Sequence, residues 1–586
     1  MNTEVFDAII VGAGQAGPAI AARCSREGLK TAVIERHHFG GTCVNVGCVP
    51  TKTLVASARA IRLAQRGAEF GFDVADLRVD MARVMARKDA IVAKSREGVE
   101  SWMRGLKGTE VIVGDACFVG QATIEVGGRR LSAPRIFLNV GGRAVRPALP
   151  GIDTVTTLDN VSVMELEVVP EHLVVVGGSY IGLEFAQLMR RLGAAVTVVE
   201  RSARLLPRED PDVSDGIRAI LEAEGVRFEL GAECLSLAPA ARGIVVGAAC
   251  GGGEGITGSH VLLAVGRQPN TDGLGLERAG IRIDARGYIE VDDQCRTSAE
   301  GVWAVGDCNG RGAFTHTSWN DHEIVVANLF DGDPRRIGDR IPCYALFIDP
   351  ALGRVGMTET EALASGKRVL RAKMPMQRVG RAREAGETQG FMKVLVDADT
   401  QRILGAAILG MNGDEVVHSL LDIMAADQPY TVISRAVHIH PTVSELVPTL
   451  LSNSSRPEQA ASSPAWYFAT WTLAFGRRHR PAVCRLWDGS AWSAGRSAAA
   501  RLHRVPTNAA RPSAAAPENG RVRAAIGLRR LYFETGHWHG DFVTDRMTAS
   551  GRVLPTVCRL PPVADQCIAD RGAGGRDRSK WMVCSK

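Results

Sequence analysis

Residues 8–35 have the sequence AIIVGAGQAGPAIAARCSREGLKTAVIE, in which an apolar run, a glycine-rich turn, a helical stretch and a second apolar run follow one another. Gly12, Gly14 and Gly17 are spaced as G-x-G-x-x-G, and Glu35 ends the second apolar run. In such a turn the first glycine permits the tight bend, the second lets a pyrophosphate approach backbone N–H groups, and the third lets the helix pack closely on the strand. A carboxylate in the place of Glu35 can accept hydrogen bonds from a ribose diol. The stretch therefore predicts a dinucleotide-binding β-α-β unit.

A second copy of this pattern begins at Leu173. Gly177, Ser179 and Gly182 take the three positions of the turn, with the small residue serine in the middle, and Glu200 ends the following strand-like run. A single turn of this kind also occurs in proteins that bind no nucleotide, but two copies with complete flanks favour two dinucleotide sites. We expect FAD in one and a nicotinamide cofactor, NADH or NADPH, in the other, because a hydride donor then has an acceptor nearby.

Length and composition indicate a globular protein of several domains. The 586 residues exceed what one hydrophobic core supports, and 45% of them are apolar. No apolar run approaches the roughly 18 residues that a membrane span needs, and the N-terminus lacks the basic and apolar regions of a signal peptide. We therefore expect a cytoplasmic protein without a membrane partner, whose 13 cysteines are free thiols unless they are catalytic or bind metal.

Charge is distributed unevenly along the chain. Residues 456–586 contain 21 Lys and Arg against 9 Asp and Glu, a net charge of +12, and the preceding residues have a net charge of −6. This tail also contains six of the nine tryptophans. It could be a basic extension that binds nucleic acid or a partner, or a segment without an evolved fold. We favour the second interpretation and expect no regular structure, because the arginines have neither helical nor strand spacing. Nucleic-acid binding is not expected from the charge of the whole chain.

Two cysteines lie close together in GGTCVNVGCVPTK, residues 40–52. Cys43 and Cys48 are five positions apart, which differs from the spacing of a zinc knuckle or a thioredoxin-type pair. Spacing alone leaves open whether they are two unrelated thiols. A basic residue, Lys52, follows them, and a nearby positive charge or a helix N-terminus favours the thiolate form of cysteine.

Taken together, several motifs resemble those of class I pyridine nucleotide-disulfide oxidoreductases, the family of glutathione reductase, dihydrolipoamide dehydrogenase and mercuric reductase. The resemblance covers about residues 4–455 and rests on GAGQAG, GGTCVNVGCVPTK, GGSYIGLE, VGRQPN, GVWAVGD and HPTVSE. It implies an α/β fold with two Rossmann-like domains and a C-terminal α+β dimerisation domain. The implied division is an FAD-binding domain in two parts, 1–150 and 273–340, an NAD(P)-binding domain at 151–272, a dimerisation domain at 341–455 and the tail at 456–586.

The resemblance also implies a mechanism. Cys43 and Cys48 would form a redox-active disulfide against the flavin, on one helix with a distorted first turn. After reduction, Cys48 would be the thiolate beside the flavin and Cys43 would attack the substrate. The resemblance implies that Lys52 and Glu184 form an ion pair near the flavin. It implies that Tyr180 covers the flavin until nicotinamide displaces it. It also implies a homodimer in which His440, oriented by Glu445, is the acid–base residue that acts on the cysteines of the other subunit.

Cofactor contacts follow from the same motifs. Those expected for FAD are Gly12, Gly14, Gly17, Glu35, Gly41, Thr42, Lys52, Gly141, Gly306 and Asp307, the last at the ribityl chain. Those expected for the nicotinamide cofactor are Gly177, Gly182, Glu200, Arg201 and Gly266. Glu200 would repel the extra phosphate of NADPH, whereas Arg201 and Arg204 would attract it; we favour NADH.

The electron acceptor stays open among a small disulfide, a metal ion and a quinone. A His-Glu pair matches dihydrolipoamide dehydrogenase. Mercuric reductases carry adjacent cysteines near the C-terminus, and no two cysteines are adjacent in this chain. Soft metal ions need thiolates to receive them, so mercury reduction is disfavoured. No resident metal site is predicted. The alternative from a different class is a non-catalytic flavoprotein whose basic tail binds nucleic acid or a partner.

Overall fold

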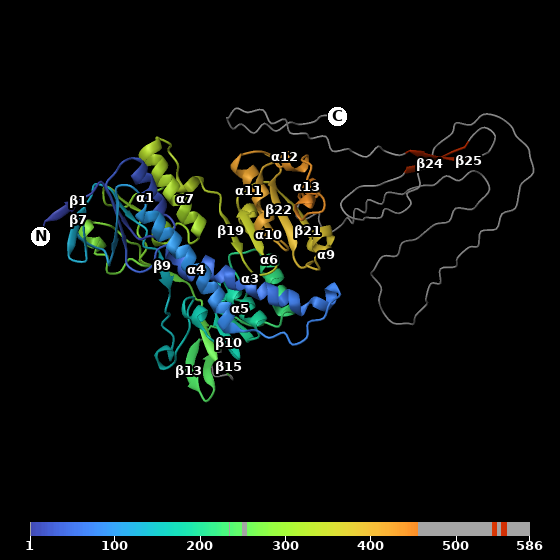
Figure 1. Ribbon diagram of the computed structural model, residues 1–586, viewed down its shortest axis with the longest axis horizontal. Coiled ribbons are helices and arrows are strands. Elements are labelled where there is room, and N and C mark those ends of the chain that lie inside the picture. The colour runs from blue at the N-terminus through green and yellow to red at the C-terminus, as the bar shows by residue number, and fades with distance from the viewer. Residues whose placement is uncertain (1, 234, 249–254, 455–541, 548–552, 559–586) are drawn as a thin grey trace, which may run out of the picture. The chain divides into compact units, whose positions relative to one another are not determined.

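The computed structural model describes residues 2–233, 235–248 and 255–454, together with the backbone of residues 542–547 and 553–558 (Figure 1). The chain divides into one unit of residues 1–469 and another of residues 470–586. In the first unit two parallel sheets packed with helices are followed by an antiparallel sheet. The predicted fold class is therefore confirmed for this unit.

The first parallel sheet contains the N-terminal glycine-rich turn. Its strands, in spatial order, are β18 (Val302–Ala304), β8 (Ile136–Leu138), β2 (Ala8–Val11), β3 (Thr31–Glu35) and β4 (Thr109–Val113), and all neighbours are parallel. On one face Ile10 packs in a cluster with residues of α1 (Gly17–Arg26) and α7 (Thr315–Val326), while α4 (Met81–Arg104) contacts β4. Strands covered on both faces are apolar throughout, which explains the continuous run at 8–11.

A small sheet covers the other face of these strands. It has the order β1 (Thr3–Val5), β7 (Arg129–Ser132), β6 (Thr123–Val126) and β5 (Cys117–Gly120). Ile9 and Val11 of β2 pack in one buried cluster with Phe118 and Ile124 from this sheet. The side chains of β2 thus alternate between helices and sheet, as the period of two in a strand requires.

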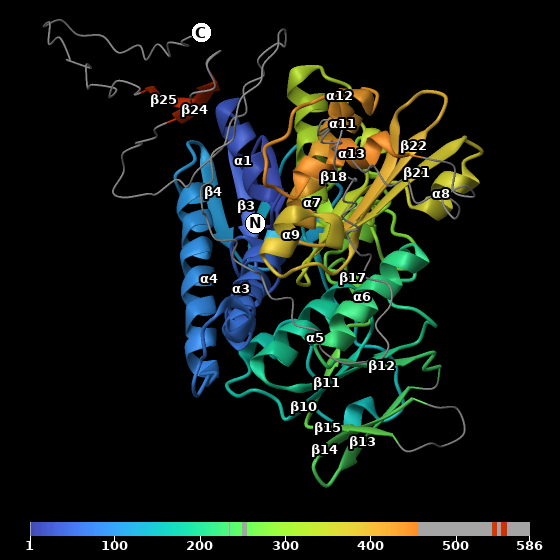
Figure 2. The same cartoon turned by 90° about the vertical axis from the view of Figure 1, so that its right-hand side faces the viewer.

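The second parallel sheet repeats the arrangement for the second glycine-rich turn (Figure 2). Its order is β12 (Arg227–Leu230), β11 (Ala195–Glu200), β10 (His172–Val176) and β16 (His260–Leu263). One face packs against α5 (Tyr180–Leu192) and α6 (Pro211–Ala223), and the other packs against the antiparallel strands β13 (Ser236–Ala240), β14 (Gly243–Gly247) and β15 (Ile256–Gly258). A two-stranded ribbon of β9 (Gly142–Ala144) and β17 (Arg267–Pro269) links the chain segments on either side of this sheet.

The C-terminal sheet is antiparallel, with the order β19 (Cys343–Leu346), β20 (Leu352–Gly356), β23 (Ile403–Leu409), β22 (Phe391–Asp397) and β21 (Val369–Pro375). Six short helices accompany it: α8 (Glu359–Ala364), α9 (Gly380–Glu384), α10 (Gly413–Val416), α11 (His418–Ala425), α12 (Thr431–Ser434) and α13 (Val447–Ser452). All residues of β22 and β23 are buried, including a lysine, Lys393.

Within the predicted tail the structure describes only β24 (Phe542–Met547) and β25 (Val553–Cys558), which pair antiparallel. The valine, threonine and phenylalanine residues of these strands favour extended backbone. The rest of residues 456–586 lies outside the described residues. None of the described helices is both long and apolar enough to cross a membrane.

Candidate active site

Both glycine-rich turns have backbone geometry that only glycine accommodates. Gly12 has φ +100° and Gly177 has φ +115°. A Cβ atom on Gly12 would lie 2.3 Å from the Asn139 carbonyl oxygen, and one on Gly177 would lie 2.4 Å from that of Ala264. The third glycine of each turn packs against the carbonyl oxygen of the first. A Cβ atom on Gly17 would lie 2.2 Å from the Gly12 carbonyl oxygen, and one on Gly182 would lie 2.0 Å from that of Gly177. Each turn therefore brings its helix as close to its strand as a dinucleotide fingerprint requires.

The two terminal glutamates occupy equivalent positions. One carboxylate oxygen accepts a hydrogen bond from a turn N–H, from Ala13 to Glu35 at 2.8 Å and from Gly178 to Glu200 at 2.7 Å. The other accepts from the N–H two residues after the glutamate, at 2.9 Å and 2.7 Å. Each carboxylate is thereby fixed at the turn, and its remaining lone pairs are available to ribose hydroxyls.

A cavity of about 1330 Å³ connects the first turn to the two cysteines. Its lining includes, of the predicted residues, Gly12, Gly14, Glu35, Gly41, Thr42, Cys43, Cys48, Lys52, Gly141, Tyr180, Glu184 and Asp307. Gly41 has φ +58°, and a Cβ there would lie 2.8 Å from the Cα of Gly14, so this wall consists of bare backbone. Its volume exceeds that of ordinary small-ligand sites, and its polar groups suit FAD: a carboxylate at the first turn and a partly buried carboxylate, Asp307, farther along.

Other predicted residues lie outside that lining. Nine predicted residues are absent from the described lining of the cavity: Gly17, Gly306, Gly177, Gly182, Glu200, Arg201, Gly266, His440 and Glu445. Gly17 and Gly306 are packed beneath the first turn and near Asn139. Gly177 and Gly182 belong to the separate second turn; Glu200 ends β11 and accepts a hydrogen bond from that turn, and Arg201 follows it.

The cysteines lie on two helices. Cys43 is in α2 (Gly41–Val46) and Cys48 begins α3 (Cys48–Gln65). The structure therefore differs from the expected single helix with a distorted first turn. Gly47 separates the helices with φ −141° and ψ −118°, and a Cβ there would lie 2.9 Å from the Thr42 carbonyl oxygen. Both cysteines are free thiols, and Cys48 stands at the N-terminus of an 18-residue helix.

This environment favours a thiolate at Cys48. Hydrogen bonding with Cys43 is the largest influence lowering the pKa of Cys48, to about 6. A hydrogen bond with the Thr315 hydroxyl, 3.2 Å from the Cys48 sulfur, and the charge of Lys52 act in the same direction, while burial opposes them. The same hydrogen bond raises the pKa of Cys43. When the two thiols share one negative charge, these influences favour Cys48 as the thiolate and Cys43 as the thiol.

Lys52 and Glu184 form the predicted ion pair, with 2.7 Å between Nζ and Oε2. The other oxygen of Glu184 accepts a hydrogen bond of 3.0 Å from the Phe347 N–H, and Lys52 Nζ lies 4.5 Å from the centre of the Phe347 ring. The segment after β19 thus holds both members of the pair. Asp307 lies 3.4 Å from Arg267, and burial is the main cause that raises its pKa.

His440 and Glu445 form a second pair, away from the cavity of their own chain. His440 Nδ1 lies 2.6 Å from Glu445 Oε2, which fixes the ring and directs Nε2 outward. The His440 side chain is 81% exposed, whereas that of Glu445 is 13% exposed. An oriented but uncovered imidazole can serve a group on another chain.

Some residues of this site were not predicted from the sequence. Thr315 contacts Cys48; Asn139 accepts a hydrogen bond from the Gly17 N–H at 3.1 Å and donates one to the Val305 carbonyl at 3.1 Å. Phe347 donates its N–H to Glu184 of the ion pair, and the Tyr344 ring lies beside that of Tyr180. These four residues belong to none of the recognisable motifs, so no sequence signal identified them.

Comparison with known proteins agrees with this geometry. The family model for pyridine nucleotide-disulphide oxidoreductases matches residues 6–321, and that for the dimerisation domain of the same proteins matches residues 343–451. The probable pyridine nucleotide-disulfide oxidoreductase RclA of Escherichia coli is 34% identical over 456 residues, covering 76% of this chain and 99% of RclA. A dihydrolipoyl dehydrogenase of Cupriavidus necator is 33% identical, covering 76% and 97%.

Among solved structures, the Cu(II) complex of RclA, described as an HOCl-induced flavoprotein disulfide reductase from Escherichia coli, has a TM-score of 0.71 and 34% identity. It covers 77% of this chain and 99% of RclA. A mercuric reductase of Lysinibacillus sphaericus is 32% identical, covering 72% of this chain and 77% of that enzyme. The family uses FAD and a pyridine nucleotide, and its dimerisation domain supports a homodimer. The chain therefore belongs to the class I pyridine nucleotide-disulfide oxidoreductases, flavoenzymes that use NAD(P)H for disulfide oxidoreduction.

Proposed function

We propose that Cys43 and Cys48 are the redox-active pair of this flavoenzyme and that its acceptor is a small disulfide. Gly12, Gly14, Glu35 and Asp307 would hold FAD in the cavity, and Gly177, Gly182 and Glu200 would hold the nicotinamide cofactor. When bound, FAD supplies two-electron transfer between the nicotinamide cofactor and sulfur. The observation that supports this proposal most strongly is that Cys43 and Cys48 both line the cavity, with the Thr315 hydroxyl 3.2 Å from the Cys48 sulfur and the Lys52–Glu184 pair in the same lining.

The proposed reaction at sulfur consists of reduction of the protein disulfide followed by two thiol–disulfide exchange steps. Two electrons and one proton convert the Cys43–Cys48 disulfide into the Cys43 thiol and the Cys48 thiolate. After losing its proton to a base, Cys43 attacks one sulfur of the substrate disulfide and the other sulfur leaves as a thiolate. Cys48 then attacks Cys43, re-forms the disulfide and releases the second substrate thiolate. Substrate is thereby reduced by the two electrons that the protein pair gives up.

The base is His440 of the other subunit. A histidine exchanges protons near neutral pH, and Glu445 fixes which ring nitrogen faces outward. Because His440 is exposed and absent from the described lining of its own cavity, its position suits a shared site in a homodimer. Tyr180 and the Lys52–Glu184 pair would shape the nicotinamide side of the cavity.

A metal ion is the second candidate acceptor. RclA, which is similar to this chain, has been solved as a Cu(II) complex. In the described part of this chain no three His, Cys, Asp or Glu side chains are grouped as a metal site. The two sulfurs would receive such an ion, because soft metal ions bind thiolates. This choice is tested by steady-state turnover with NADH and one acceptor at a time: lipoamide, glutathione disulfide, Cu(II), Hg(II) or a quinone. If Cu(II) were the one acceptor of this set to support turnover, the disulfide assignment would be overturned.

Acidification should remove the thiolate. The pKa of Cys48 is lowered to about 6, so the charged form exists above that pH and disappears as the pH falls through it. In the anaerobically reduced protein, the long-wavelength charge-transfer absorbance between thiolate and flavin should therefore decrease with a midpoint near pH 6. Thr315→Val, which removes one hydrogen-bond donor while keeping the side-chain shape, should move that midpoint upward. Unchanged absorbance down to about pH 4 would contradict the assignment.

Cofactor preference should depend on Glu200. We infer that NADH is the better donor, because the fixed carboxylate would repel the 2′-phosphate of NADPH. Glu200→Gln removes the charge and keeps one of the two oxygens that accept hydrogen bonds from Gly178 and Ser202. It should raise the ratio of kcat/KM for NADPH to that for NADH by about tenfold, equivalent to about 1.4 kcal/mol. Arg201→Ala, on the exposed neighbouring residue, should change the ratio in the opposite direction; an unchanged ratio in both variants would refute the role of this loop.

A further inference from the structure

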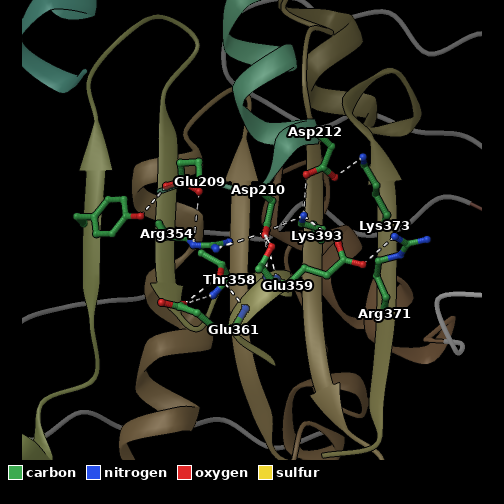
Figure 3. A network of polar contacts seen from close by, with 12 residues as sticks. Glu209, Asp210, Asp212, Arg354, Thr358, Glu359, Glu361, Arg371, Lys373 and Lys393 are labelled. Atoms are coloured by element: carbon green, nitrogen blue, oxygen red, sulfur yellow. Dashed lines mark hydrogen bonds and ion pairs between the residues drawn. The ribbon is translucent and has the colours of Figure 1, made fainter. Parts of the chain in front are cut away.

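A network of buried charges joins the second nucleotide-binding sheet to the C-terminal sheet (Figure 3). Glu209 and Asp210 end the loop that begins after Glu200, and they face Arg354 of β20 and Lys393 of β22. Lys393 Nζ lies 2.9 Å from Asp210, and Arg354 lies 3.4 Å from Asp210 and 3.7 Å from Glu209. The exposed fractions of these side chains are between 0% and 2%.

Buried charges of this kind fix the elements that carry them. Each charge has lost its hydration, so separating it from its partner would leave an unpaired charge in the interior. Asp210 also accepts hydrogen bonds from the N–H groups of Glu359 and Thr360 at the start of α8. The end of the loop therefore moves only together with the C-terminal sheet.

Glu209 differs from the other members of this network, because its hydrogen-bond donor lies on the active-site side. Its Oε1 accepts a 2.6 Å hydrogen bond from the Tyr344 hydroxyl. Its Oε2 has no hydrogen-bond partner among the described residues, and neither do Nε and Nη1 of Arg354. Within the described chain, Tyr344 thus gives the Glu209 carboxylate its one hydrogen bond.

The Tyr344 ring is in turn part of an aromatic group at the cavity. It stacks on Phe314 with 5.7 Å between ring centres and an interplanar angle of 8°. Tyr180, the first residue of α5, meets both rings edge-on, at 5.5 Å from Tyr344 and 6.0 Å from Phe314. Tyr180 therefore rests against two parallel rings, and one of these is fixed at its hydroxyl by Glu209.

We propose that Tyr344 is a positioning residue that, through its hydrogen bond to Glu209, holds Tyr180 in the place where it competes with the nicotinamide cofactor. The inference rests on the proposed function and on the role that the family resemblance implies for Tyr180, a cover over the flavin until nicotinamide displaces it. A cofactor that must displace a side chain binds more weakly the more stable the covering state is. The hydrogen bond therefore weakens cofactor binding and keeps the site closed when no cofactor is present.

The test compares the Tyr344→Phe variant with the wild type, both as full-length, flavin-containing proteins. The variant keeps the stacked ring and loses only the hydroxyl. Anaerobic stopped-flow reduction with NADH should show a dissociation constant for NADH about two- to tenfold lower than in the wild type, the range expected for one lost hydrogen bond. Glu209→Gln is the matched control, because an amide can still accept from or donate to the phenol while the charge facing Arg354 is removed. Its dissociation constant should stay within about twofold of the wild type.

A Tyr180→Ala background shows whether the effect passes through Tyr180. In that background Tyr344→Phe should change the dissociation constant no further, because interacting residues are non-additive. The inference is overturned if Tyr344→Phe binds NADH as the wild type does, if Glu209→Gln reproduces its effect, or if the effect persists without Tyr180. Failure of both NADH and NADPH to reduce the wild-type flavin would instead overturn the proposed function, and this inference with it.

Discussion

Cys48→Ser should reduce NADH-driven turnover of a disulfide acceptor by about 10³-fold or more, because serine can neither form the disulfide nor remain as a thiolate. Charge-transfer absorbance in the reduced protein should disappear with it. Flavin binding should be retained, since the only change in the cavity wall is the replacement of one sulfur atom by a smaller oxygen atom. Turnover and absorbance spectra of the purified variant measure all three quantities.

Cys117→Ser is a suitable control for this experiment. Cys117 is also a partly exposed free thiol, but it lies in β5 and does not line the described cavity. We expect turnover of this variant to equal that of the wild type. A Cys48→Ser variant that retains both its charge-transfer absorbance and its turnover would show that the thiolate is a different residue.

His440→Ala should lower disulfide turnover by about 10²- to 10⁴-fold, the usual contribution of a positioned acid–base group. Reduction of the flavin by NADH should be unaffected, because His440 does not line the described cavity of its own chain. Glu445→Gln should have a smaller effect, since the amide oxygen can still accept from His440 Nδ1 and orient the ring. Separate rates for the NADH and disulfide half-reactions distinguish these outcomes.

Mixed dimers test whether the site is shared. In a heterodimer of one Cys48→Ser subunit and one His440→Ala subunit, a shared arrangement leaves one site with an intact cysteine pair facing an intact histidine. Such a dimer should have about half the turnover of the wild-type dimer, although both homodimers are inactive. If His440 acted on the cysteines of its own chain, both sites of the heterodimer would be defective and no activity would return.

The sequence predicts those parts of the fold and site that depend on short-range spacing. The glycines at 12 and 177 are needed because any Cβ there would strike a neighbouring carbonyl oxygen, and Glu35 and Glu200 follow at a fixed distance along one β-α-β unit. The Lys52–Glu184 pair was identified from its two motifs, although 132 positions separate the residues.

Long-range contacts outside the motifs were not predictable. Thr315 reaches Cys48 across 267 positions, and Tyr344 reaches Glu209 across 135. Neither a hydroxyl nor an aromatic residue carries a periodic or charged signal that would mark such a partner. The sequence does not predict the break at Gly47 either, because a glycine between two short helical runs is equally compatible with one irregular helix.

In the proposed reaction, electrons leave the flavin through the bond between Cys43 and Cys48. The most direct measurement is mass spectrometry of the peptide containing both residues after thiol alkylation, before and after anaerobic addition of NADH to the oxidised protein. We predict no alkylation at either residue before NADH and alkylation of both after it, with the buried Cys24, Cys295 and Cys308 unmodified throughout. Full alkylation of Cys43 and Cys48 before NADH is added would show that the two residues do not form a disulfide in the oxidised protein.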